Sequence, residues 1–99
     1  MKKPYVLTHT KTFLKEVLKI IEYKAENDHA DATSFYQNLC EKLETIRKFP
    51  EMGAQPKHYP RFCARGYRFM LFGRYNIFYS VRGQKVYLMR LRHASRNPV

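Results

Sequence analysis

Residues 73–93 read GRYNIFYSVRGQKVYLMRLRH, and they carry the clearest structural pattern of the chain. Its side chains alternate with a period of two, which is the spacing of a β-strand with one buried face. Gly73 precedes the first run and Gly83 separates it from the second, at positions typical of hairpin turns. The pattern predicts strands over residues 74–81 and 85–93, and an aromatic run before them predicts a third over residues 62–72. In the last strand one face is expected to carry Tyr87, Met89, Leu91 and His93, and the other Val86, Leu88, Arg90 and Arg92.

The chain before this sheet has the 3.6-residue period of amphipathic helices. Apolar side chains recur at that spacing over residues 13–25 and again over residues 32–46. Hydroxyl and carboxylate side chains cap helices, so the first is expected to be capped by Thr8 or Thr10 and the second to begin at Asp31 or Thr33. Two amphipathic helices joined by a short turn predict an antiparallel hairpin.

A short strand over residues 4–8 and a polar loop over residues 54–61 complete the expected elements. Since an amphipathic hairpin must bury its apolar side, we expect it to cover one face of the sheet. The prediction is a single α+β domain over residues 1–99. Its order is β-α-α-β-β-β, with the helical hairpin packed on one face of a small, mainly antiparallel sheet.

Charge is distributed unevenly along the 99 residues. Residues 1–51 hold nine Lys and Arg together with all eight Asp and Glu, whereas residues 52–99 hold ten Lys and Arg and no carboxylate. A face of one sign repels itself, so a half without acids is typical of a recognition surface. Eight of the ten are Arg, which makes bidentate contacts with phosphate and carboxylate. The net charge of +11 therefore predicts an anionic partner.

The sheet face without helices is where the arginines are expected to gather. Strand alternation places Arg90 and Arg92 on the same side, about 7 Å apart, while Arg68 begins a neighbouring strand and Arg96 follows the last one. Such a face suits a nucleic acid, an acidic protein, or only solvent, and these uses stay open. The candidate target-binding residues are Arg65, Arg68, Arg74, Arg90, Arg92 and Arg96.

One cluster of this half has catalytic character. His93 can act as a general acid or base near neutral pH, and Arg90, Arg92 and Arg96 can stabilise charge on a transferring phosphate. A local role for His93 at the end of its strand is the alternative. The spacing of Cys and His suits no metal, and the glycines suit no phosphate loop, so no metal or cofactor is expected. Cys40 and Cys63 are expected to be buried thiols of a cytoplasmic protein without a membrane segment.

Over essentially its whole length the sequence resembles the RelE/ParE superfamily of toxins from type II toxin–antitoxin pairs. The resemblance lies in the opening strand, the two helices, Phe49-Pro50-Glu51-Met52-Gly53, Gly66-Tyr67-Arg68, Gly73-Arg74-Tyr75-Asn76-Ile77-Phe78-Tyr79, and Val86 through Leu91 followed by Arg92-His93-Ala94-Ser95-Arg96-Asn97-Pro98. It implies a bacterial protein that arrests growth until an acidic antitoxin wraps and neutralises it.

The superfamily has two branches. A RelE-like protein would be a metal-independent endoribonuclease that cleaves mRNA on the ribosome, with Arg68, Arg90, His93 and Arg96 as catalytic residues. However, Ala94 stands where some of these nucleases carry a tyrosine, and no carboxylate follows Glu51. The ending is more similar to the ParE-like branch, which poisons DNA gyrase by binding. We therefore expect a ParE-like growth inhibitor of a DNA-processing target such as DNA gyrase, with the nuclease and a non-toxic RNA-binding module as alternatives.

Overall fold

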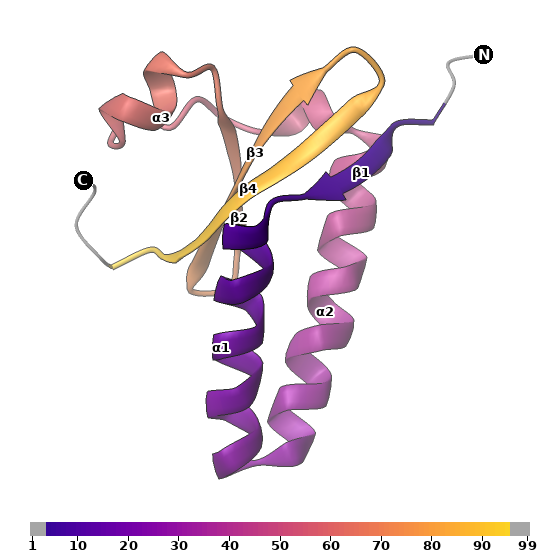
Figure 1. Ribbon diagram of the computed structural model, residues 1–99, viewed down its shortest axis with the longest axis vertical. Helices are drawn as coiled ribbons and strands as arrows, with labels where there is room; N and C mark the ends of the chain where they lie inside the picture. Colours follow the sequence, from indigo (N-terminus) through magenta and orange to yellow (C-terminus); the bar gives the residue numbers. More distant parts are fainter. Residues whose placement is uncertain (1–3, 96–99) are drawn as a thin grey trace.

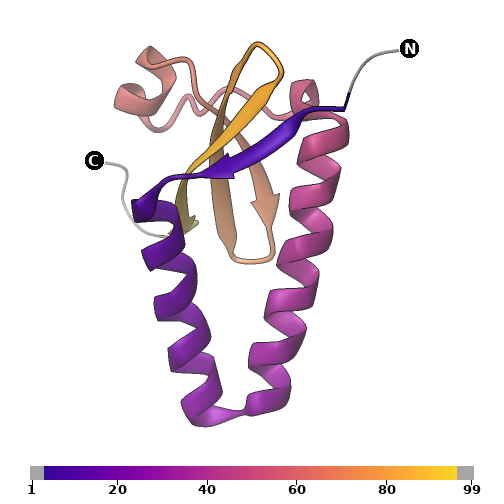
Figure 2. The same cartoon turned by 45° about the vertical axis from the view of Figure 1, so that its right-hand side comes forward.

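The computed structural model describes residues 4–95. Its elements are β1 (Val6–His9), α1 (Lys11–Asn27), α2 (His29–Lys48), the 3-10 helix η1 (Pro50–Met52), α3 (Pro60–Ala64), β2 (Arg68–Phe72), β3 (Tyr75–Arg82) and β4 (Lys85–His93). The strands form one sheet in the order β1-β4-β3-β2, in which β1 runs parallel to β4 and the other pairs are antiparallel. The predicted α+β class, element order and helical hairpin are confirmed (Figure 1, Figure 2).

The two long helices begin where side chains cap them. Thr10 accepts a hydrogen bond from the Phe13 N–H at 3.0 Å, as one of the two predicted caps should. Asp28 accepts one from the Ala30 N–H at 2.9 Å, so α2 begins at His29, before the predicted Asp31 or Thr33. The predicted start of α2 was wrong because a single residue, Asp28, both separates the two helices and caps α2.

The main core lies between the helical hairpin and one sheet face. Buried side chains from α1, α2, β3 and β4 meet there, namely Phe13, Val17, Phe35, Leu39, Ile46, Ile77, Tyr79, Val86, Leu88 and Leu91. The opposite sheet face carries a second, aromatic cluster of Tyr59, Phe62, Tyr67 and Phe78. The sheet is therefore covered on both sides, by the hairpin on one and by the segment around α3 on the other (Figure 1).

The strand predicted over residues 62–72 is shorter in the structure. Its first part is the helix α3, because Pro60 supplies the fixed φ of a first helical residue and Phe62 packs on Phe78 with ring centroids 4.7 Å apart. Gly66 has a φ of 77°, and the chain turns there before β2 begins at Arg68. The loop expected over residues 54–61 is likewise partly structured, since Ala54 bridges to Phe69 at the edge of β2.

A β-bulge changes the alternation of β4. Phe78 lies opposite Arg90 whereas Tyr79 lies opposite Leu88, so β4 carries one extra residue, Met89, between them. Leu91 consequently joins Val86 and Leu88 in the helix-side core, contrary to the strict alternation expected from the sequence.

The predicted burial of both thiols was wrong. Cys40 is exposed and Cys63 is partly exposed. Each follows a core residue directly, Leu39 and Phe62, and neighbouring positions on a helix differ by about 100° in direction. Within residues 4–95, no helix is long and apolar enough to cross a membrane.

Candidate functional site

The arginines predicted to share one sheet face lie on two faces. Residues directly opposite each other in antiparallel strands point to the same side. Arg90 is opposite Phe78 and Arg92 is opposite Asn76, which places both on the face away from the hairpin, as predicted, although α3 and its aromatic cluster cover part of this face, which was expected to lack helices. Arg68 is opposite Tyr79, which belongs to the helix-side core, so Arg68 points to the other side. The expectation that Arg68 joins Arg90 and Arg92 was therefore wrong.

Arg68 makes hydrogen bonds within the fold that give it a structural role. Its Nη1 donates to the backbone oxygen of Gly53 at 2.9 Å and to that of Glu51 at 3.3 Å. The buried Tyr79 hydroxyl donates to the backbone oxygen of Pro50 at 2.6 Å, and burial raises the pKa of this phenol. Two side chains from adjacent strands thus satisfy carbonyls of η1, which hold it against the sheet.

Arg90 forms an ion pair with Glu16, a residue that the sequence analysis did not identify as part of the site. Its Nη2 donates to Glu16 Oε2 at 3.0 Å, and its Nε lies 3.2 Å from both carboxylate oxygens. Glu16 Oε1 also accepts the Leu91 N–H at 2.9 Å. The guanidinium carbon lies 6.0 Å from the Phe62 ring centre. Arg90 therefore links α1, β4 and α3.

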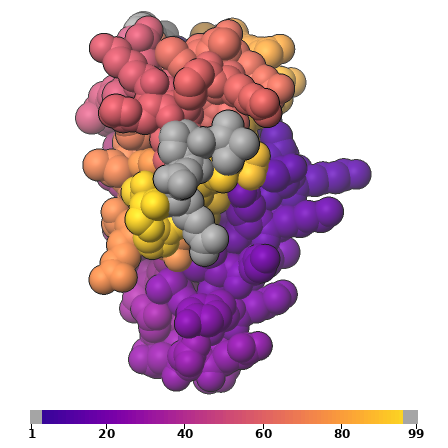
Figure 3. Space-filling model, turned by 90° about the vertical axis from the view of Figure 1, so that its left-hand side faces the viewer, coloured from indigo at the N-terminus to yellow at the C-terminus, as the bar shows by residue number. Residues whose placement is uncertain are grey.

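A groove of about 690 Å³ follows α1 along the end of β4. Figure 3 shows α1, the end of β4 and α3 on one face of the molecule. The charged side chains that line the groove are Glu16, Lys19, Arg90 and Arg92, and its aromatic ones are Tyr23, Tyr75 and His93. Of the predicted site residues, the structure thus brings together Arg90, Arg92 and His93.

His93 contacts Ser95 through its Nδ1 atom. The Ser95 N–H donates to His93 Nδ1 at 3.2 Å, and the Ser95 Oγ lies 2.6 Å from the same nitrogen. A backbone N–H can only donate, so Nδ1 accepts in this contact, and Nε2 makes no bond to Ser95. The Tyr75 and His93 rings meet edge to face, with centres 5.4 Å apart.

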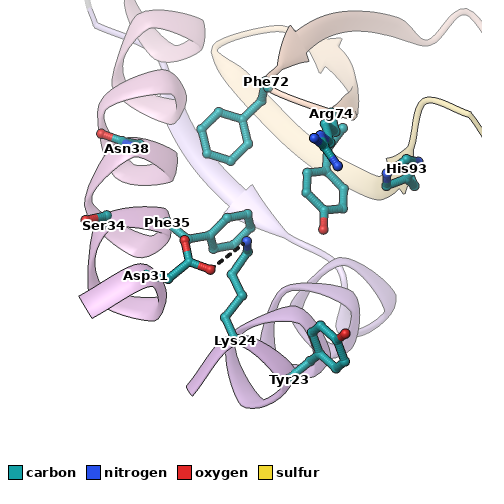
Figure 4. A pocket seen from close by; sticks show the side chains of 11 residues that line it. Tyr23, Lys24, Asp31, Ser34, Phe35, Asn38, Phe72, Arg74 and His93 are labelled. Atoms are coloured by element: carbon teal, nitrogen blue, oxygen red, sulfur yellow. Dashed lines mark hydrogen bonds and ion pairs between the residues drawn. The ribbon is translucent and has the colours of Figure 1, made fainter. Parts of the chain in front are cut away.

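A second hollow, of about 480 Å³, lies on the other side of the same aromatic residues. Tyr23, Tyr75 and His93 line both hollows. Figure 4 shows the second one, where Lys24 and Asp31 form an ion pair at 3.2 Å and Arg74 lies near His93. The two hollows therefore form one surface around His93.

The remaining predicted arginines are placed differently. Arg65 ends α3 and Arg74 lies in the β2–β3 turn, and both are exposed. Arg96 lies outside the described residues. Sequence reasoning missed Lys19 and Tyr23 on α1, although Tyr23 stands on the polar side of an amphipathic helix, where an aromatic side chain is a signal. Among residues 4–95, no three His, Cys, Asp or Glu side chains gather as metal ligands would.

The sequence profile of the ParE toxin of the type II toxin–antitoxin system parDE matches residues 7–98. The chain belongs to the ParE toxin family. A chain from the chromosomal ParDE toxin–antitoxin system of P. aeruginosa has the same fold, with a TM-score of 0.74 over 92% of this chain and 97% of that one, at 16% identity. No curated protein sequence matches this member of the ParE toxin family. The predicted resemblance and its ParE-like branch are confirmed.

Proposed function

We propose that this ParE family toxin arrests growth by binding a DNA-processing target such as DNA gyrase, and that an acidic antitoxin neutralises it. The observation that carries the proposal is the family match over residues 7–98. The charge distribution supports it, because a half with ten cations and no carboxylate is suited to an anionic partner.

The placement of the candidate catalytic residues favours binding over cleavage. A nuclease needs its acid, its base and its charge-stabilising groups around one scissile phosphate. Arg68 points to the opposite sheet face from Arg90, and its guanidinium donates to the backbone oxygens of Glu51 and Gly53. Arg90 is committed to Glu16. Of the predicted catalytic residues that the structure describes, His93 alone makes no hydrogen bond to an acid or a carbonyl.

Exposed apolar side chains support a protein partner. Leu14, Leu18 and Tyr36 on the helical hairpin are 41–55% exposed although they are large and apolar. Large apolar side chains exposed on the same pair of helices suit contact with another protein. The acidic antitoxin is proposed as that partner, and its carboxylates would complement the charge of residues 52–99.

Supercoiling by purified DNA gyrase tests the target. We expect the toxin to inhibit supercoiling at micromolar concentration and an excess of the acidic protein encoded beside its gene to restore it. Total mRNA from cells expressing the toxin should stay intact. Unaffected supercoiling together with codon-positioned cuts in translated mRNA would replace this proposal with the ribosome-dependent nuclease.

A further inference from the structure

Most of the polar side chains that line the groove between α1 and the end of β4 can donate hydrogen bonds. Lys19 and Arg92 carry positive charges that have no carboxylate partner within residues 4–95. The Nδ1 atom of His93 accepts from the Ser95 N–H, which leaves Nε2 as the ring nitrogen that can donate to a ligand. A ligand that complements these groups must supply negatively charged acceptors.

Among the described residues, Glu16 is the one carboxylate that lines the groove, and groups of the protein itself bind both of its oxygens. Its two oxygens accept from Arg90 and from the Leu91 N–H, and its side chain is only 23% exposed. Because the Arg90 charge offsets that of Glu16, the groove keeps the two positive charges of Lys19 and Arg92. An anion that enters therefore meets no unpaired negative charge from these residues.

Tyr23 adds an exposed aromatic ring to this groove, which binding of an anion by charge alone would not need. It lies near the end of α1, is 70% exposed, and borders both hollows. A large aromatic ring left open beside cations gives a flat surface for stacking. Such a ring beside cations suits a single-stranded nucleic acid, because a base can stack on the ring while the neighbouring phosphates meet the cations.

We propose that this groove binds single-stranded nucleic acid, with Lys19 and Arg92 on the phosphates and an unpaired base stacked on Tyr23. This goes beyond the proposed binding of a protein target and does not depend on it. The volume of about 690 Å³ holds about one or two nucleotides and not a duplex, and a base inside a duplex is stacked on its neighbours and has no free face for Tyr23. The His93 Nε2–H supplies a further donor at the junction of the two hollows.

Fluorescence anisotropy of the full-length toxin with labelled 12-nucleotide DNA and RNA tests the proposal. The matched variants are R92Q in the groove and R82Q on the exposed β3–β4 hairpin, since both remove one positive charge from an arginine. We expect R92Q to weaken binding about tenfold and to lower the salt slope by about 0.7, the contribution of one phosphate in a single strand. R82Q should change affinity less than about twofold.

Y23A tests the stacking. Loss of one base–aromatic stack should weaken binding of the single strands about tenfold or more. A duplex of the same length and a labelled oligoglutamate should bind more weakly and should not respond to Y23A. Comparison of the DNA and RNA arms identifies which single strand is preferred. Melting temperatures close to that of the wild type establish that each variant is folded.

Three results would overturn the proposal. Equal losses for R92Q and R82Q would show that the charge acts diffusely. An unchanged affinity of Y23A for the single strands would remove the stacked base. Oligoglutamate that binds more tightly than either nucleic acid would assign the groove to an acidic protein segment. None of these measurements involves gyrase, so they fail or succeed separately from the supercoiling assay.

Discussion

An alanine at position 53 has no room beside Tyr79. Its Cβ would overlap the phenolic oxygen of Tyr79 and lie 2.7 Å from Cζ and 3.0 Å from Cε1. The backbone there has a φ of −65° and a ψ of 147°, which any residue adopts, so G53A changes side-chain space alone. Tyr79 is fully buried and donates to the Pro50 carbonyl at 2.6 Å. The ring can give way only by losing that hydrogen bond or by displacing η1.

The two effects set the size of the loss. Overpacking a buried site costs about 1–3 kcal/mol, and leaving a buried carbonyl without its donor costs about 1–3 kcal/mol. We therefore expect G53A to lower the free energy of unfolding by about 2–6 kcal/mol. In a domain of this size 1 kcal/mol corresponds to about 4–8 °C in Tm, so the shift should exceed about 8 °C.

Thermal and urea unfolding of G53A, Y79F and the double variant measure these contributions. Y79F loses only the hydrogen bond and should cost about 1–2 kcal/mol. In the Y79F background G53A should cost less than alone, because the overlapping oxygen is gone, but the contact with Cζ keeps the cost above zero. Stability of G53A within about 0.5 kcal/mol of the wild type would refute the packing argument.

Three further predictions concern other groups. Burial raises the pKa of Tyr79 above its ordinary value of 10.0, so the folded protein holds this proton more tightly than the unfolded chain. The associated stability is complete below pH 10 and is lost as the pH rises above it, and Y79F should lack this part of the alkaline loss in a series of urea titrations. E16Q removes a partly exposed ion pair and should lower the free energy of unfolding by about 1 kcal/mol, measured by thermal unfolding. The control E22Q, on the exposed side of α1, should leave the free energy of unfolding unchanged. Equal effects of the two variants would contradict the role of Glu16. Cys40 should react with a thiol reagent faster than Cys63, and the reverse order would contradict their exposures.

Most helices and strands, and the packing of the helical hairpin on the sheet, could be predicted from the amino-acid sequence alone. The 3.6-residue period predicted both helices of the hairpin, and the period of two predicted β3 and β4 with turns at Gly73 and Gly83. These glycines have φ of 58° and 59°, a conformation that glycine adopts without strain. Such signals are local, because each depends on residues a few positions apart. They also sufficed for the family resemblance and for the cationic character of residues 52–99.

The sheet face and the hydrogen-bond partners of each arginine could be read only from the tertiary structure. The extra residue Met89 in β4 brings Leu91 back to the helix-side core, and the pairing of β2 with β3 turns Arg68 toward η1. Glu16 reaches Arg90 across 74 positions of the chain. Strand register and ion pairs of this span depend on how the helices pack on the sheet, which no local period reports. The sequence therefore predicted a cationic surface, and the packing places Arg90, Arg92 and His93 along one groove of it.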